Sequence, residues 1–157
     1  MPKYIICDTN EPNKGKSESL LKVFDYMEQK YSQYRTAIER DFICQGDKDI
    51  YAEYEINGTK IAILTLGDPV WQYNDLMNRA AGMFSADLIL CASQKDYRNK
   101  TNKHIADICK QYGYREVKIR NPYVDSRLLP IETPLFPDAF AHEINILMHG
   151  LYGIFLI

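Results

Sequence analysis

Short apolar runs alternate along this chain with segments whose apolar residues recur at helical spacing. The apolar runs predict strands, and the segments with a period near 3.6 predict amphipathic helices. Strands that alternate with helices favour an α/β fold, here a three-layer sandwich with a mainly parallel central sheet of about five strands. The predicted strands cover 3–8, 60–66, 87–92 and 116–120, and the predicted helices cover 17–31, 73–85, 100–112 and a last one capped by Asp138.

The clearest antiparallel hairpin is predicted at one side of this sheet. Apolar and polar residues alternate over 50–56, Asn57-Gly58 favours a type I′ turn, and a nearly apolar strand returns over 60–66. An alternating strand is typical of a sheet edge, whereas a run that is apolar throughout suits the centre of a sheet covered on both faces. We therefore expect 50–56 at the edge and 60–66 at the centre. In the weaker region 32–48, only Phe42-Ile43-Cys44 favours a short extended piece.

Composition limits the class of protein. The 157 residues suit one domain, residues 1–157, and the formal net charge of −2 gives no large positive excess for nucleic acid or anionic membranes. No stretch approaches about 20 consecutive apolar residues, and the first residues lack the features of a signal peptide. The cysteines show no metal-ligand spacing, and Cys7, Cys91 and Cys109 fall at apolar positions. We therefore expect a cytoplasmic protein with reduced thiols and no membrane segment.

Residues 4–17 carry the strongest functional pattern in the chain. An apolar strand is followed by a turn-rich loop, and Gly15-Lys16-Ser17 then opens a helix. A loop of successive backbone N–H groups then meets the positive end of the helix dipole, and a lysine adds a full charge. This order of elements favours a phosphate-binding site. The alternative is a surface turn with a lysine near the start of a helix.

The same residues resemble the Walker A motif of the P-loop NTPase superfamily, with Asn10 in the place of the first glycine. The resemblance implies that backbone amides of Asn13 to Ser17 hold a β-phosphate, that Lys16 neutralises phosphate charge and that Ser17 binds Mg²⁺. Residues assigned to the nucleotide site are Asn13, Lys14, Gly15, Lys16, Ser17 and Glu18. The Lys14 side chain either adds positive charge there or is a solvated lysine.

The resemblance also implies a carboxylate at the end of a neighbouring apolar strand, which completes the magnesium shell. Asp68 is the candidate, so Lys16 and Asp68 are the predicted catalytic residues, and Ser17 and Asp68 are the predicted metal ligands. The alternative is that Asp68-Pro69 marks a turn. Asp8 and Glu11 lie close to the loop in sequence, and they would repel a triphosphate unless they face a metal or solvent.

We therefore expect a nucleotide-binding protein that takes ATP with Mg²⁺, with phosphoryl transfer as its reaction if it is an enzyme. GTP is less favoured, because only Asp96 matches the guanine-reading pattern after the strand 87–92. One alternative is a regulatory module that binds a nucleotide without turnover. Another is a protein-interaction module that binds none. The apolar tail 151–157 either completes the core or docks on a protein partner or a second copy.

Overall fold

The fold is seen in a computed structural model. It describes residues 2–10, 16–40, 50–65, 81–94, 100–121 and 135–157. Within these ranges the chain forms a six-stranded sheet in the order β2-β3-β4-β5-β1-β6. The strands are β1 (Lys3–Asn10), β2 (Arg35–Arg40), β3 (Ile50–Ile56), β4 (Thr59–Leu64), β5 (Leu88–Gln94) and β6 (Tyr114–Arg120).

Four neighbouring strands of this sheet, β4, β5, β1 and β6, run parallel to one another. The first strand of the hairpin, β3, runs in the opposite direction. β1 pairs in parallel with β5 on one side and with β6 on the other, and β4 pairs in parallel with β5. β3 runs antiparallel to both β4 and β2. The sheet is therefore mixed, with β1 inside its parallel half.

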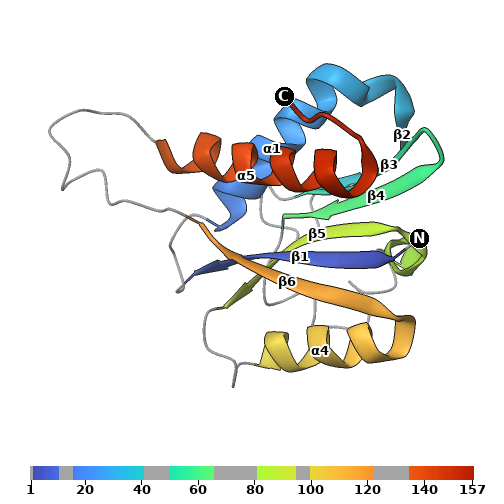
Figure 1. Cartoon of the computed structure of the whole chain (residues 1–157), viewed down its shortest axis with the longest axis vertical. Coiled ribbons are helices and arrows are strands. Elements are labelled where there is room, and N and C mark those ends of the chain that lie inside the picture. Colours follow the sequence, from blue (N-terminus) through green and yellow to red (C-terminus); the bar gives the residue numbers. More distant parts are fainter. Residues whose placement is uncertain (1, 11–15, 41–49, 66–80, 95–99, 122–134) are drawn as a thin grey trace, which may run out of the picture.

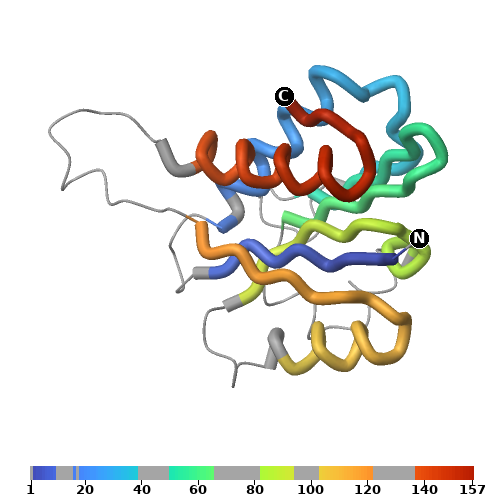
Figure 2. The backbone as a smooth tube through the Cα atoms, in the orientation of Figure 1, coloured from blue at the N-terminus to red at the C-terminus, as the bar shows by residue number. Residues whose placement is uncertain are grey.

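Helices cover both faces of the sheet. α1 (Lys16–Tyr31) and α5 (Leu135–Tyr152) lie together on one face, and α4 (Lys100–Tyr112) lies on the other (Figure 1). Two short 3₁₀ turns, η1 (Ser32–Tyr34) and η2 (Ala81–Ser85), complete the described elements. The trace in Figure 2 follows the chain from the blue strand β1 to α1 and finally to the red α5.

Each face of the sheet has its own apolar core. Leu20 and Met27 of α1 and Phe140 and Ile144 of α5 are buried against one face. Ile105 of α4 is buried against the other face. These two cores make the three layers of an α/β sandwich, as the sequence pattern predicts.

Several element boundaries agree with the sequence pattern. The helix predicted over 100–112 is α4, and the strand predicted over 3–8 is β1, which continues to Asn10. The apolar return strand is central, because β4 lies between β3 and β5. The last helix begins at Leu135, so Asp138 lies inside its first turn and is not the cap that the sequence predicts.

The prediction that 50–56 is an edge strand is wrong. This strand is β3, and β2 pairs with it on the side away from β4. All side chains of β3 except that of Glu55 are buried. The polar member Glu53 is also buried, and a hydrogen bond that the Tyr51 hydroxyl donates to its carboxylate offsets part of the cost of its burial. Of the helix predicted over 73–85, only Ala81–Ser85 is described, and it is a 3₁₀ turn. The extended piece predicted at Phe42–Cys44 lies outside the described residues.

The apolar tail completes the core. Gly153 ends α5 with a φ of +68°, and its N–H donates to the His149 carbonyl at 2.9 Å. Beyond it, Ile154 and Leu156 are buried in the core between the sheet and α1 and α5. The backbone N–H of Leu156 donates to the Asn145 side-chain oxygen at 2.7 Å.

Within the described ranges, no helix is both long enough and apolar enough to cross a bilayer.

Two isoleucines two positions apart on α5 test this packing. Ile144 is fully buried, whereas Ile146 is 69% exposed. We expect Ile144→Ala to lower the free energy of unfolding by about 2–5 kcal/mol, because it leaves a cavity in the core. Ile146→Ala should lower it by about 0.5 kcal/mol or less. Urea denaturation of dilute protein measures both, and equal losses would contradict the assigned face of α5.

Candidate functional site

The carboxyl ends of the parallel strands meet at one edge of the sheet, and α1 begins there. β1 ends at Asn10 and α1 starts at Lys16, so only residues 11–15 connect them. In Figure 1 the arrowheads of β1 and β5 and the start of α1 lie at the left. Ligands of parallel α/β sheets bind at this edge. The predicted order of strand, short connection and lysine-led helix is therefore present.

The described part of the candidate site is the first turn of α1. Lys16 is the first residue of this helix and is half-buried, and Glu18 is exposed. Ser17 belongs to the helix, but its side chain is outside the description, as are Asn13, Lys14, Gly15 and Asp68. The proposed roles of these residues in binding phosphate and magnesium remain predictions.

Asp8 lies beneath the start of α1 and is fully buried. Its carboxylate accepts hydrogen bonds from the Ser19 hydroxyl and from the Asn121 side-chain amide, the latter at 2.9 Å. The Asn121 backbone N–H also donates to the Thr9 carbonyl at 3.1 Å. The carboxyl group therefore connects β1 both to the first turn of α1 and to the residue that follows β6.

Burial raises the pKa of Asp8 from 3.8 to about 7. Desolvation is the largest cause, since it disfavours the charged carboxylate. The hydrogen bonds from Ser19 and Asn121 and the positive charge of Lys16 act in the opposite direction. Near neutral pH, Asp8 is therefore divided between its protonated and ionised forms.

The sequence predicts that Asp8 repels a triphosphate unless it faces solvent or a metal. Instead it is buried and hydrogen-bonded, which makes the neutral form accessible near pH 7. Its repulsion of an anion near α1 is correspondingly smaller than that of an exposed carboxylate. Glu11, the other acid in that prediction, lies outside the described residues.

The opposite face of β1 and β5 carries thiols and hydroxyls. Cys7 and Cys91 are both buried, as predicted, with their Sγ atoms 3.8 Å apart. Two register positions further on, Thr9 lies beside Ser93, and both are buried. Among the described residues, none is a hydrogen-bond partner of the Ser93 hydroxyl. Because side chains alternate along a strand, these groups lie on the face away from Asp8.

Asp68 follows β4, and β5 lies between β4 and β1 in the sheet. The strand that precedes Asp68 is therefore one strand removed from β1, and the role of Asp68 stays a prediction. Among the residues with described side chains, no three His, Cys, Asp or Glu groups are arranged to hold a metal ion.

Asn121 is the site residue that the sequence does not indicate. It lies 113 positions from Asp8 in the sequence. The only feature of the sequence that could have indicated it is its position directly after the predicted strand 116–120. The carboxyl ends of parallel strands collect polar groups of this kind.

Comparisons of the chain with protein-family models, with curated protein sequences and with solved structures gave no significant match.

Asp8 should give the unfolding free energy a characteristic pH dependence. Its pKa is higher in the folded state, so its stabilising contribution is present below about pH 4 and is lost as the pH rises through about 7. The full change is on the order of 4 kcal/mol. Asp8→Asn keeps a neutral polar group and should remove this dependence. Urea denaturation at several pH values measures it, and identical pH profiles for both proteins would contradict the shifted pKa.

Proposed function

We propose that the protein binds the phosphates of a nucleotide at the start of α1, with ATP and Mg²⁺ as the ligand. The observation that carries the proposal is the position of Lys16. It opens a 16-residue helix at the edge where parallel strands end, directly after the inner strand β1. A helix N-terminus attracts anions through its unpaired N–H groups and its dipole, and an ammonium group adds a full positive charge.

The state of Asp8 supports an anion at this position. Because Asp8 is half neutral near pH 7, the net charge under the helix start is less negative than its sequence suggests. Lys16 already interacts with this carboxyl group through its charge. A bound phosphate would strengthen the protonated form of Asp8, since a like charge nearby disfavours the carboxylate.

In this proposal, the amides of residues 13–17 and the Lys16 ammonium group hold the phosphates, and Ser17 and Asp68 hold the magnesium ion. The ion would neutralise phosphate charge, which is the chemistry that phosphoryl transfer requires. The compartment we propose is the cytoplasm, where the buried thiols of Cys7 and Cys91 stay reduced.

A module that binds a nucleotide without turnover is the second candidate function. It is favoured by the sheet order, because β5 separates β1 from the strand that precedes Asp68. Release of inorganic phosphate from ATP and Mg²⁺ decides between the two. Turnover that Lys16→Ala abolishes supports an enzyme, and binding without phosphate release supports the module.

Ligand-dependent thermal stability tests the binding itself. A ligand at 100 times its Kd adds about 2.7 kcal/mol to the free energy of unfolding and should raise Tm by roughly 5–10 °C. We expect this shift for wild-type protein with ATP and Mg²⁺, and no shift for Lys16→Ala. GTP, ADP and inorganic phosphate, each with and without Mg²⁺, show which part of the ligand is recognised.

The matched control is Lys110→Ala. Lys110 is exposed in the last turn of α4, so this variant removes the same charge from a helix at a distant position. It should keep the full shift in Tm. No shift for wild-type protein with any of these ligands would reject nucleotide binding and leave the protein-interaction module.

A further inference from the structure

β6 is the last strand of the sheet in the order of the described strands. It pairs with β1 on one side, and within the described ranges no strand pairs with the other. The Asn121 N–H donates to Thr9 of β1, so the odd-numbered residues direct their backbone groups inward. Because these directions alternate along a strand, Glu116 and Lys118 present their N–H and C=O groups to the open side. An exposed edge of this kind is a template for another strand.

The sequence of β6 is Tyr-Arg-Glu-Val-Lys-Ile-Arg. When two copies of this strand are placed antiparallel, negative and positive side chains can lie opposite one another. In an antiparallel pair, two opposing residues must both point toward the partner or both point away. One register that meets this condition is centred on Val117. In it, Glu116 of each copy lies opposite Lys118 of the other copy, which gives two pairs of opposite charges. The opposing pairs in that register are Val117 with itself, Glu116 with Lys118, Arg115 with Ile119 and Tyr114 with Arg120.

Other allowed registers place like charges opposite one another. Centring the pair on Glu116 or on Lys118 brings two identical charges together, and centring it on Ile119 brings Lys118 opposite Arg120. Like charges directly opposite each other destabilise a strand pair. The charges on this edge therefore disfavour these registers and favour the register centred on Val117.

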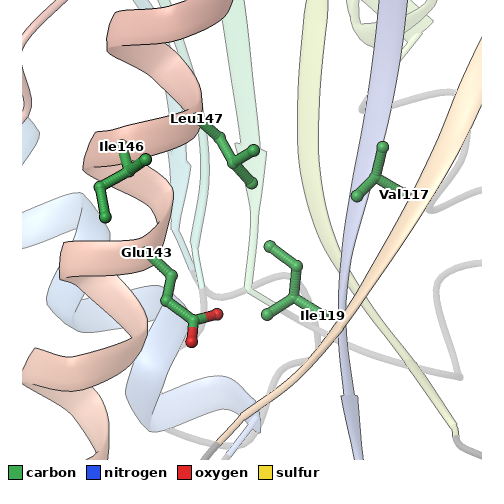
Figure 3. Close-up of a pocket in the computed structure, with 5 residues that line it drawn as sticks. All are labelled: Val117, Ile119, Glu143, Ile146 and Leu147. Atoms are coloured by element: carbon green, nitrogen blue, oxygen red, sulfur yellow. The ribbon is translucent and has the colours of Figure 1, made fainter.

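An apolar groove lies beside the same edge. Val117 and Ile119 of β6 face Ile146 and Leu147 of α5 across a groove of about 320 Å³, with Glu143 beside it (Figure 3). Ile146 is 69% exposed there. On the α5 face of β6, Val117 and Ile119 are only half-buried.

The register centred on Val117 covers this groove. Odd-numbered residues of β6 lie on the α5 face, so Val117 and Ile119 of both copies would join into one apolar strip. Arg115 of the second copy lies opposite Ile119, on the side where Glu143 lines the groove. Its aliphatic stem would cover Ile119, and its guanidinium group would meet an opposite charge.

We propose that the protein forms a symmetric homodimer by antiparallel pairing of two β6 strands, centred on Val117, with the α5 grooves of both copies covered in the interface. The dimer is independent of the proposed nucleotide site, because it needs only β6 and α5. It extends the sheet of one copy into that of the other and removes an open edge from each.

Two charge-reversal variants test the register. Glu116→Lys places lysines opposite lysines in a homodimer, and Lys118→Glu places glutamates opposite glutamates. Each variant alone should raise the dimer Kd by about tenfold or more. Mixed in equal amounts, the two variants should form a heterodimer as tight as the wild-type dimer, because every opposing pair then has opposite charges. Sedimentation velocity across a concentration series measures all three species.

The ion pair that Lys118 and Glu116 already form within one chain, at 3.6 Å, does not confound the mixture. Mixing leaves each chain unchanged, so any recovered association arises between chains. Asp107→Lys and Lys110→Glu, at exposed positions of α4, make the same charge changes and should dimerise like wild-type protein. A wild-type protein that stays monomeric up to millimolar concentration, or variants that fail to associate on mixing, would overturn the proposal. If the wild-type protein stays monomeric, the groove either binds another partner or is exposed to solvent.

Discussion

The buried carboxyl group of Asp8 is the interaction on which the candidate site depends. It binds the Ser19 hydroxyl of α1 and the Asn121 side chain beyond β6, so three segments distant in sequence meet at one group. A buried acid without these partners would destabilise the fold by several kcal/mol, and the two donors offset part of that cost. The start of α1 is held against the sheet at this point, beside the half-buried Lys16.

The same carboxyl group links the electrostatics of the site to the fold. Burial favours its neutral form, whereas Lys16 and the two hydrogen bonds favour its charged form. The balance lies near neutral pH, so a change in the charge at the helix start changes the protonation of Asp8. A phosphate bound by α1 and a proton bound by Asp8 would therefore favour each other. This coupling distinguishes the arrangement from a lysine exposed on an ordinary helix.

Local pattern predicts much of this fold. The period of apolar residues identifies α4 to the residue, and the continuous apolar run identifies β4 as a central strand. β2 is missed because its six residues contain only two half-buried apolar side chains, Ala37 and Ile38. The wrong edge assignment of β3 follows from that omission. A strand's neighbours depend on distant pairing, which the alternation within the strand does not encode.

The site is predicted less completely than the fold for a similar reason. Sequence indicates Lys16 through its place between a strand and a helix, but the partners of Asp8 come from 11 and 113 positions away. The groove beside β6 arises from the spacing between a helix and a strand, and Ile146 alone gives no signal for it.

Backbone-amide NMR during titration with ATP and Mg²⁺ tests the central claim most directly, because it reports each N–H group at the start of α1. We predict that the largest chemical-shift changes fall on residues 13–18 and on Ser19, that they saturate with ligand, and that they are absent in Lys16→Ala. Shift changes confined to other parts of the chain, or none at saturating nucleotide, would contradict phosphate binding at this helix.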